Sequence, residues 1–296
     1  MGGKERKIGM TNGIKQGCTA STTLFKIITY EIIKELEEKG RGITVGNITL
    51  ESLFFADDSF ILADSVENAT HNLNVLIEAS KKFGLKINRE KCNVIVFNDR
   101  KNTIKEIENI KVVNKIKYLG IVIDNKRELF KSQKEIILKQ AQQYAWMTNG
   151  IIHRCVNKML IGKTFWKNVV IPSILQGIGI ITFTKKEISK LQSIENEVYR
   201  KILGGKGYTP ISILRGDVGS SKMRTRFIES KLVMIKGILV GKNTLTKEIL
   251  YKTREDKGNK WNQQVEEYLK EVNITFIEIN TMTKEKIKQK INQWDT

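Results

Sequence analysis

Two adjacent carboxylates, Asp57 and Asp58, interrupt an apolar run that extends from Ser52 to Ala63. The aromatic and aliphatic residues on both sides predict two short strands joined by a tight turn. Aspartates in turns usually bond the local backbone. Side chains alternate faces along a strand, so at least one of the two aspartates must face a cleft or solvent. Because both flanks are strongly apolar, burial would bring two negative charges together in a low-dielectric setting, which is costly unless cations neutralise them. Carboxylate oxygens suit Mg²⁺ or Mn²⁺, so we predict that Asp57 and Asp58 bind a divalent metal.

The residues around this run predict the elements that position it. Apolar residues recur at helical spacing over 25–36, and Gly40 is expected to end this helix. The hydroxyl-rich stretch over 19–23 is expected to cap its start. Residues 42–50 predict a strand pair around Gly46-Asn47, and residues 66–83 predict a second helix that ends at Gly84.

Downstream residues predict first more strands and then long helices. Residues 85–97 are expected to form a turn carrying Lys91 and then a strand, residues 98–111 a loop, and residues 115–124 a strand, a turn and a strand. Helices are expected from about Arg127 onward, with one near Lys158–Val170 before Pro172 and one over 187–203. Trp146 and Trp166 are expected to pack in a core. The predicted fold class is therefore α+β.

Charge is distributed unevenly along the 296 residues, whose net charge is +19. Residues 1–100 contain 14 Lys and Arg against 13 Asp and Glu, whereas the rest contains 37 against 19. Positive charge concentrated after a metal site is typical of a surface that binds nucleic acid through its phosphates. A solvated lysine-rich surface is the alternative. Hydrophobic residues make up 40% of the chain and charged residues 28%, which is the composition of a folded protein.

The three cysteines, Cys18, Cys92 and Cys155, are widely separated. Their spacing supports neither a disulfide framework nor a zinc site. No apolar run approaches the ~20 residues that a membrane helix needs, so no membrane association is expected. We therefore expect an intracellular protein, either nuclear or cytoplasmic.

Four segments in order resemble the reverse transcriptases of non-LTR (LINE-type) retrotransposons. Phe55-Ala56-Asp57-Asp58 is similar to the metal-binding box of that family. The glycine-containing stretch 13–25, the pattern Gly-Leu-x-Ile-Asn-x-x-Lys over 84–91 and Tyr118-Leu119-Gly120-Ile121 resemble the neighbouring polymerase motifs. A looser resemblance continues from Leu175-Gln176-Gly177 through Arg215.

The resemblance implies a role for each matching residue and a set of ligands. Asp57 and Asp58 would hold Mg²⁺ (or Mn²⁺) for catalysis, with Lys91 assisting the leaving pyrophosphate. The RNA template, the DNA primer and dNTPs would be the partners. The residues implied in nucleotide and template binding are Gln16, Gly17, Ser21, Phe55 and Ala56, and those implied in gripping the primer are Tyr118, Leu119, Gly120 and Ile121.

The resemblance also implies an organisation in three parts. Residues 1–125 would be a partial polymerase palm, an antiparallel sheet with helices. Residues 126–241 would be a helical thumb-like and post-polymerase region, and residues 242–296 a basic helical tail. The family takes a further catalytic aspartate from a strand upstream of the Gln16-Gly17 segment, and no Asp precedes Gln16. We therefore expect a truncated reverse transcriptase without the fingers, inactive alone.

Two further readings stay open at this stage. One is a non-catalytic protein whose basic helices bind RNA or DNA. The other is a protein similar to group II intron maturases, which share the aspartate box. Whether the chain is an enzyme is therefore left undecided by the sequence.

Overall fold

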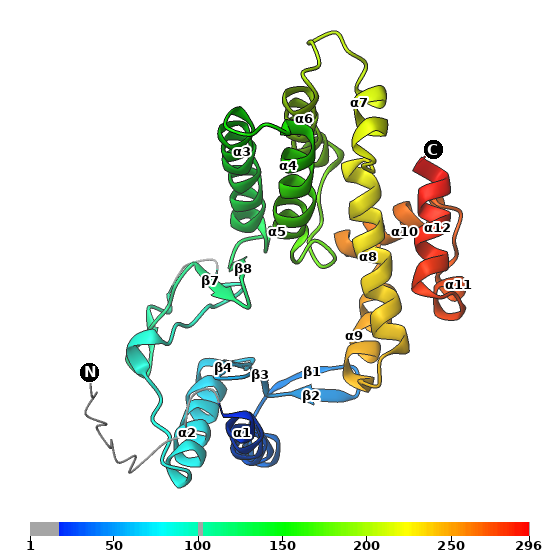
Figure 1. Ribbon diagram of the computed structural model, residues 1–296. Helices are drawn as coiled ribbons and strands as arrows, with labels where there is room; N and C mark the ends of the chain where they lie inside the picture. The colour runs from blue at the N-terminus through cyan, green and yellow to red at the C-terminus, as the bar shows by residue number, and fades with distance from the viewer. Residues whose placement is uncertain (1–17, 100–102, 296) are drawn as a thin grey trace, which may run out of the picture. The chain divides into compact units, whose positions relative to one another are not determined.

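The computed structural model of the protein describes residues 18–99 and 103–295. It is an α+β structure, as predicted, in which helices accompany short antiparallel strand pairs. The chain forms two compact units, one ending at Val113 and the other starting at Asn114 (Figure 1). No helix in the described part of the chain combines the length and apolarity needed to cross a membrane.

The first unit combines helices with β-hairpins. Two helices that are distant in sequence, α1 and α2, pack against each other, and their buried contact residues are Ile32, Leu36, Val75, Leu76 and Ala79. Its elements are α1 (Thr19–Lys39), β1 (Ile43–Val45), β2 (Ile48–Leu50), β3 (Ser52–Phe55), β4 (Asp58–Ile61), α2 (Val66–Lys82), the 3₁₀ helix η1 (Arg89–Lys91), β5 (Glu106–Ile107) and β6 (Ile110–Lys111).

Most sequence predictions for the first unit are confirmed, including both helices and the first two hairpins. Three are wrong. Cys18, and none of the hydroxyl residues, occupies the N-cap of α1, and it makes no capping hydrogen bond with its side chain. The strand expected after Lys91 reduces to one isolated bridge between Val94 and Val112. The expected loop 98–111 contains the β5–β6 hairpin, whose turn residues Glu108 and Asn109 both have positive φ.

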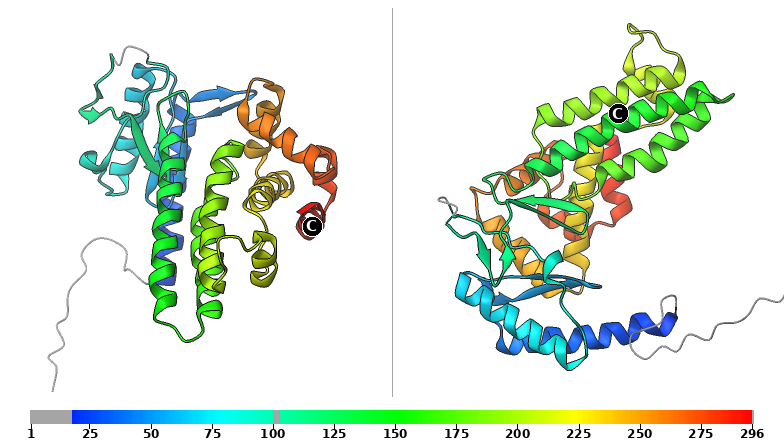
Figure 2. Two further views of the ribbon diagram at one scale, coloured as in Figure 1. Left: turned by 90° about the horizontal axis from the view of Figure 1, so that it is seen from above. Right: turned by 90° about the vertical axis from the view of Figure 1, so that its left-hand side faces the viewer.

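The second unit begins with a hairpin and continues as helices. Figure 2 shows α3, α4 and α6 packed side by side. Its elements are β7 (Lys115–Tyr118), β8 (Ile121–Asp124), α3 (Lys131–His153), α4 (Lys158–Phe165), the π-helix η2 (Trp166–Val170), α5 (Ile171–Leu175), α6 (Lys185–Leu203), α7 (Ile211–Val218), α8 (Met223–Val240), α9 (Thr244–Glu255), α10 (Lys260–Glu271), α11 (Phe276–Thr281) and α12 (Lys284–Asp295).

The helices expected over 158–170 and 187–203 are confirmed in type, with one difference at Pro172. The helical path passes through Pro172, which lies in the first turn of α5 directly after η2, and continues to Leu175. The last helical turn before it widens into the π-helix η2. Gly204 ends α6 in the left-handed conformation, with φ of 64°.

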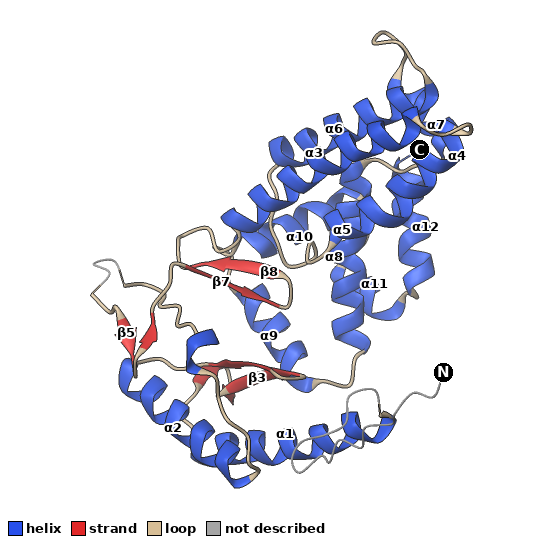
Figure 3. Cartoon of the chain, turned by 60° about the vertical axis from the view of Figure 1, so that its left-hand side comes forward, coloured by secondary structure: helices blue, strands red, loops and turns tan. Residues whose placement is uncertain are grey.

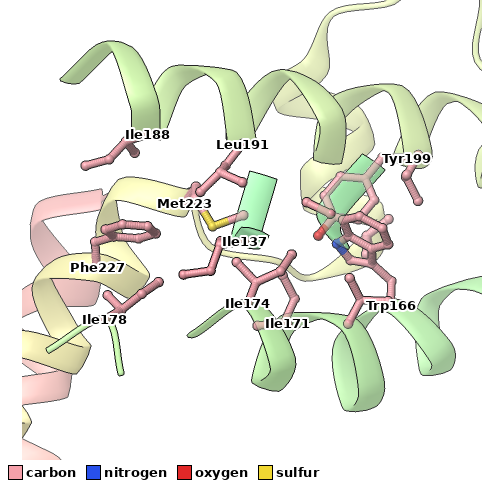
Figure 4. Close-up of a cluster of buried hydrophobic side chains, with 14 of the residues drawn as sticks. Ile137, Trp166, Ile171, Ile174, Ile178, Ile188, Leu191, Tyr199, Met223 and Phe227 are labelled. Carbon is pink, nitrogen blue, oxygen red and sulfur yellow. The ribbon is translucent and has the colours of Figure 1, made fainter. Parts of the chain in front are cut away.

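A large apolar core lies between α3, α6 and the α4–α5 segment (Figure 4). Trp166 is 1% exposed at its centre, which confirms its predicted core role. Trp146 is 79% exposed on α3, so the same prediction for Trp146 is wrong. The two tryptophans differ because Trp166 belongs to η2, in the middle of the bundle, whereas Trp146 lies on the side of α3 that faces solvent.

A buried carboxylate, Glu195, links three parts of this core. Its Oε1 accepts hydrogen bonds from Trp166 Nε1 at 3.1 Å and from the Tyr199 hydroxyl at 2.6 Å. Arg226 of α8 pairs with the same carboxylate at 2.6 Å. Because every partner of this charge is a side chain of the bundle, the network joins η2, α6 and α8 at one point.

The C-terminal helices pack on α8 and form a second apolar core. The side of α8 that carries Ile228, Leu232 and Ile235 contacts buried residues of α9 through α12, among them Val265 and Ile287. The preceding α8 residue Phe227 belongs to the first core. Helix α8 therefore contributes to both cores, and residues 244–295 belong to the same compact unit as the bundle.

Candidate functional site

The two predicted metal ligands lie at the tip of the β3–β4 hairpin. Phe55 pairs with Asp58, which leaves Ala56 and Asp57 as a two-residue turn. Ala56 has a φ of 54°, a conformation that two-residue hairpins demand and that is unfavourable for alanine. Backbone strain at a non-glycine residue is a frequent mark of a functional turn.

The two faces of this hairpin differ sharply. Phe54 and Ile61 pack against the core of α1 and α2, so one face is covered. Phe55 and Asp58 are cross-strand partners on the opposite face, where Phe55 is 63% exposed and Asp58 is exposed as well. The open face therefore presents an aromatic ring and a carboxylate side by side.

Asp57 and Asp58 are both solvent-exposed, which agrees with the expectation that at least one of them faces a cleft or solvent. A two-residue turn projects beyond the helices that cover the hairpin's other face, so its side chains stay in water. No cluster of three or more potential metal ligands exists among residues 18–99 and 103–295. The adjacent carboxylates are nevertheless hard oxygen donors of the kind that Mg²⁺ takes through one or two carboxylates.

A single buried amide, Asn72 of α2, holds the base of this hairpin. Its Nδ2 donates to the carbonyl oxygens of Leu62 at 3.0 Å and Arg41 at 2.9 Å, and its Oδ1 accepts from the Arg41 backbone N–H at 2.7 Å. Asn72 is fully buried. It thus joins the chain entering β1 to the chain leaving β4 and fixes the hairpin against α2.

The other predicted residues of the first unit are dispersed. Gln16 and Gly17 lie outside the described residues. Ser21 lies in the first turn of α1, where the backbone N–H groups of Ala20 and Ser21 lower the pKa of the exposed Cys18 thiol. Lys91 is exposed at the end of η1, and within the described ranges no ion pair links it to either aspartate.

The predicted primer-gripping residues form the closed end of the β7–β8 hairpin (Figure 3). Tyr118 pairs with Ile121, and Leu119-Gly120 forms the turn with φ values of 48° and 83°. Asp124 at the base accepts hydrogen bonds from the Ser132 N–H at 2.8 Å and the Ser132 hydroxyl at 2.6 Å, at the start of α3. Helix α3 thereby holds the base of the hairpin.

The middle of the same hairpin is also attached to α3. Gln133 is buried, and its Oε1 accepts a hydrogen bond from the Val122 backbone N–H at 2.9 Å. This side chain satisfies an N–H that β8 points away from β7, so it closes part of a strand edge that would otherwise be open.

A feature that the sequence predictions missed is a long stretch without acidic residues. Residues 136–186 contain no Asp or Glu, and their basic residues are Lys139, Arg154, Lys158, Lys163, Lys167, Lys185 and Lys186. The stretch covers most of α3 and all of α4, η2 and α5. Its exposed surface includes Trp146 and Leu160, which is 60% exposed. Counting charges over residues 1–100 and over the remainder hides this pattern. A count of acidic residues over shorter segments of the sequence would have found it.

Comparison with known proteins agrees with these local features. Residues 1–123 match the family described as reverse transcriptase (RNA-dependent DNA polymerase). The chain is 24% identical over 231 residues to a retrovirus-related Pol polyprotein from the type-1 retrotransposable element R2 of Bradysia coprophila, with 73% of this chain and 25% of that protein aligned.

Two further R2 Pol polyproteins are similar over shorter stretches. That of Nasonia vitripennis is 24% identical over 184 residues, with 54% of this chain and 18% of the relative aligned. That of Popillia japonica is 32% identical over 87 residues, with 29% of this chain and 14% of the relative aligned. The chain therefore spans about a quarter or less of the length of these relatives.

Proposed function

Residues 1–123 of this chain belong to the reverse transcriptase family, in the form found in non-LTR retrotransposons, and on that premise we propose that the chain binds metal and primer for RNA-directed DNA synthesis. The observation that carries the proposal is the Asp57-Asp58 pair at the strained tip of a two-residue hairpin with one open face. Within this proposal residues 1–125 act as part of a palm and residues 126–241 as a thumb-like region.

Asp57 and Asp58 are the residues that would hold Mg²⁺ or Mn²⁺. Such ions orient substrate phosphates and stabilise the attacking and leaving oxygens of the transfer reaction. Exposure of both carboxylates leaves their oxygens accessible to a metal and to phosphates. Phe55 and Ala56 would flank the nucleotide, and Lys91 supplies a cation in the same unit.

Metal binding tests this proposal directly. We expect purified protein to bind Mn²⁺ weakly, because one hairpin supplies the carboxylates of only one site, and to lose this binding in the Asp57→Asn, Asp58→Asn double variant. The readout is the free Mn²⁺ signal in electron paramagnetic resonance. Asp64→Asn is the matched control, because Asp64 is also exposed and is hydrogen-bonded to Asn68. Equal Mn²⁺ binding by the double variant would contradict the proposal.

Catalysis by the 296-residue chain alone is a separate question. Two-metal nucleotidyl transfer uses carboxylates that hold two ions ~4 Å apart, which requires ligands from more than one strand. We therefore expect no template-dependent dNTP incorporation by this chain. Robust Mg²⁺-dependent incorporation that disappears in Asp57→Ala would overturn this expectation.

The acid-free stretch supports a second candidate function, non-catalytic binding of RNA or DNA. Lys139, Lys158 and Lys167 are exposed, and in the part of the chain that the structure describes they form no ion pairs. We expect the triple Lys→Gln variant to reduce the slope of log K against log salt by about 2–3 for duplex DNA. Lys252→Gln is the control, because Lys252 pairs with Glu255 at 3.0 Å.

The two candidate functions differ in their response to Asp57→Ala. Non-catalytic binding alone predicts that duplex affinity and its salt slope are unchanged while Mn²⁺ binding by the wild type is absent. The reverse transcriptase proposal predicts Mn²⁺ binding that depends on Asp57. The hypothesis of a protein similar to group II intron maturases also predicts Mn²⁺ binding that depends on Asp57.

A further inference from the structure

The turn after α5 lies directly against the tip of the β7–β8 hairpin. Gln176 has φ of −60° and ψ of 123°, Gly177 has φ of 73°, and the Ile178 N–H donates to the Leu175 carbonyl at 3.2 Å. These values define a type II β-turn, whose third position requires positive φ and therefore favours glycine. The proposed function assigns no role to this turn.

At the contact between the turn and the hairpin tip, an added Cβ would require a neighbouring side chain to move. A Cβ placed on Gly120 would lie 2.9 Å from Gln176 Nε2. A Cβ placed on Gly177 would lie 2.6 Å from Ile121 Cδ1. Two glycines with positive φ, one on each element, thus allow the two turns to meet.

The hairpin tip is the part that needs such support. Leu119 is held at φ of 48°, which is unfavourable for a residue with a branched side chain, and its side chain is 43% exposed. A strained residue keeps its conformation only where the surrounding structure determines it. Asp124 and Gln133 hold the base and the middle of the hairpin, and the Gln176-Gly177 turn is a contact that reaches the tip.

We propose that Gln176 and Gly177 are positioning residues that hold the Leu119-Gly120 tip in the conformation that contacts the end of the primer. This inference rests on the proposed role of the β7–β8 hairpin in primer binding. Neither residue needs to touch nucleic acid. Their effect is transmitted through Gly120 and Ile121, which they contact.

The test measures recognition of a primer end rather than overall affinity. The full chain is titrated, by fluorescence anisotropy, with a primer–template that has a recessed 3′ end and with a blunt duplex of equal length. The ratio of the two Kd values measures the preference of the protein for a recessed primer end over a blunt end. We expect wild-type protein to prefer the recessed end by about tenfold, which corresponds to about 1.4 kcal/mol.

Two variants remove the support in different ways. Gln176→Ala deletes the amide beside Gly120 without changing the backbone, and Gly177→Ala introduces a Cβ against Ile121. We expect both to lower the preference to about twofold or less while the Kd for blunt duplex stays unchanged. Ile121→Val removes Cδ1, so the Gly177→Ala, Ile121→Val double variant should recover part of the preference that Gly177→Ala alone loses.

Gly179→Ala is the matched control. It lies two residues further along the same segment, and its Cβ would lie 2.8 Å from Met234 Sδ on α8, away from the hairpin. We expect this variant to retain the wild-type preference. Loss of preference in Gly179→Ala equal to that in Gly177→Ala would show a general packing defect and overturn the inference.

The remaining outcomes separate this inference from the proposed function. If the wild type prefers recessed ends and the Gln176 and Gly177 variants do so equally, the positioning role is wrong and the proposed function stands. If the wild type does not distinguish the two substrates, primer binding by the hairpin is wrong and the inference fails with it. Thermal unfolding of each variant is the control that tests whether the fold is retained.

Discussion

Two hairpins of this protein carry the proposed chemistry, and they are built alike but supported differently. Both β3–β4 and β7–β8 have four-residue strands, a two-residue turn and strained non-glycine residues, Ala56 and Leu119, at positive φ. The first is fixed at its base by Asn72 and leaves its tip in solvent. The second is held at the base, middle and tip.

This difference indicates different demands on the two tips. A metal-binding tip takes part of its rigidity from the ions and phosphates that it binds, since these add bonds that the protein alone lacks. A tip that contacts a primer must hold its shape by itself. The comparison therefore predicts that substitutions around β7–β8 act through several local supports, whereas those around β3–β4 act through its base or through ligand binding.

The largest expected effect is on the pH dependence of stability of the second unit, whose helix α3 supports the β7–β8 hairpin. Lys231 of α8 is 1% exposed, donates to the Ile181 carbonyl at 3.2 Å and lies 5.3 Å from the ring centroid of Trp261. Burial, aided by repulsion from Lys134, lowers the pKa of Lys231 to about 7. Below pH 7 the Lys231 amine is protonated in both the folded and the unfolded state. Between pH 7 and about 10.5 it is protonated mainly in the unfolded state, so the unfolded state binds more protons than the folded state.

Stability should therefore rise with pH across that window, by an amount on the order of several kcal/mol. Lys231→Met should remove this part of the slope in urea unfolding measured from pH 6.5 to 9.5. Lys201→Met is the control, since Lys201 is exposed and solvent surrounds its amine. An identical slope in wild type and Lys231→Met would contradict the expectation.

The base of the β3–β4 hairpin should be the most sensitive point of the first unit. Asn72→Leu removes three hydrogen bonds and leaves backbone groups of Arg41 and Leu62 unpaired. We expect a loss of about 3 kcal/mol in local stability, measured by hydrogen exchange at the Arg41 amide. Asn74→Leu, on the exposed side of α2, should leave that exchange unchanged. Similar exchange in both variants would rule out Asn72 as the support.

Loss of a single support of the β7–β8 hairpin should lower local stability less than loss of Asn72 does in the first unit. Gln133→Ala removes the acceptor of the Val122 N–H, and we expect a cost of about 1–2 kcal/mol, because the base and tip contacts remain. Exchange at the Val122 amide should accelerate, with exposed Gln142→Ala as the control. If Gln133→Ala unfolded the whole hairpin, the supports at the base and tip would not act independently.

Strain at the β7–β8 tip, the proposed primer contact, gives an effect of the opposite sign. Leu119→Asn places a residue that tolerates positive φ at the first turn position, so we expect a stability gain of about 0.5–1 kcal/mol. The same change should reduce the preference for recessed primer ends, because the exposed apolar side chain is lost. A variant that loses both stability and preference would contradict a functional origin of the strain. Leu129→Asn, also at an exposed leucine, is the control.

The β3–β4 tip, the proposed metal site, should show the smallest effect on stability. Asp57→Asn and Asp58→Asn each change an exposed side chain at the turn, so the unfolding free energy should change by less than about 0.5 kcal/mol. Their loss of Mn²⁺ binding would then be a direct effect on the ligands. A stabilisation of more than about 1 kcal/mol in the absence of metal would instead indicate mutual repulsion between the carboxylates.

Patterns that depend on neighbouring residues were predicted well from the sequence. The two-residue turn at Gly46-Asn47 follows from local conformational preference and from the apolar residues beside it, and the strand, turn and strand over 115–124 follow from the apolar residues there. Helices α2 and α6 follow from apolar periodicity, with Ser65 and Thr184 as their N-caps. The weak β5–β6 hairpin was missed because strands of two residues leave no periodic signal.

The aspartate box and its flanking motifs were determined by the sequence alone, because the residue types and their order carry the family resemblance whatever the chain's tertiary contacts. Tertiary structure alone decided that both Asp57 and Asp58 are exposed, that Trp146 faces solvent and that Asn72 supports the β3–β4 hairpin. It also decided that the Gln176-Gly177 turn meets Gly120 and Ile121. These features depend on which distant segments pack together, and no local preference of the chain specifies that.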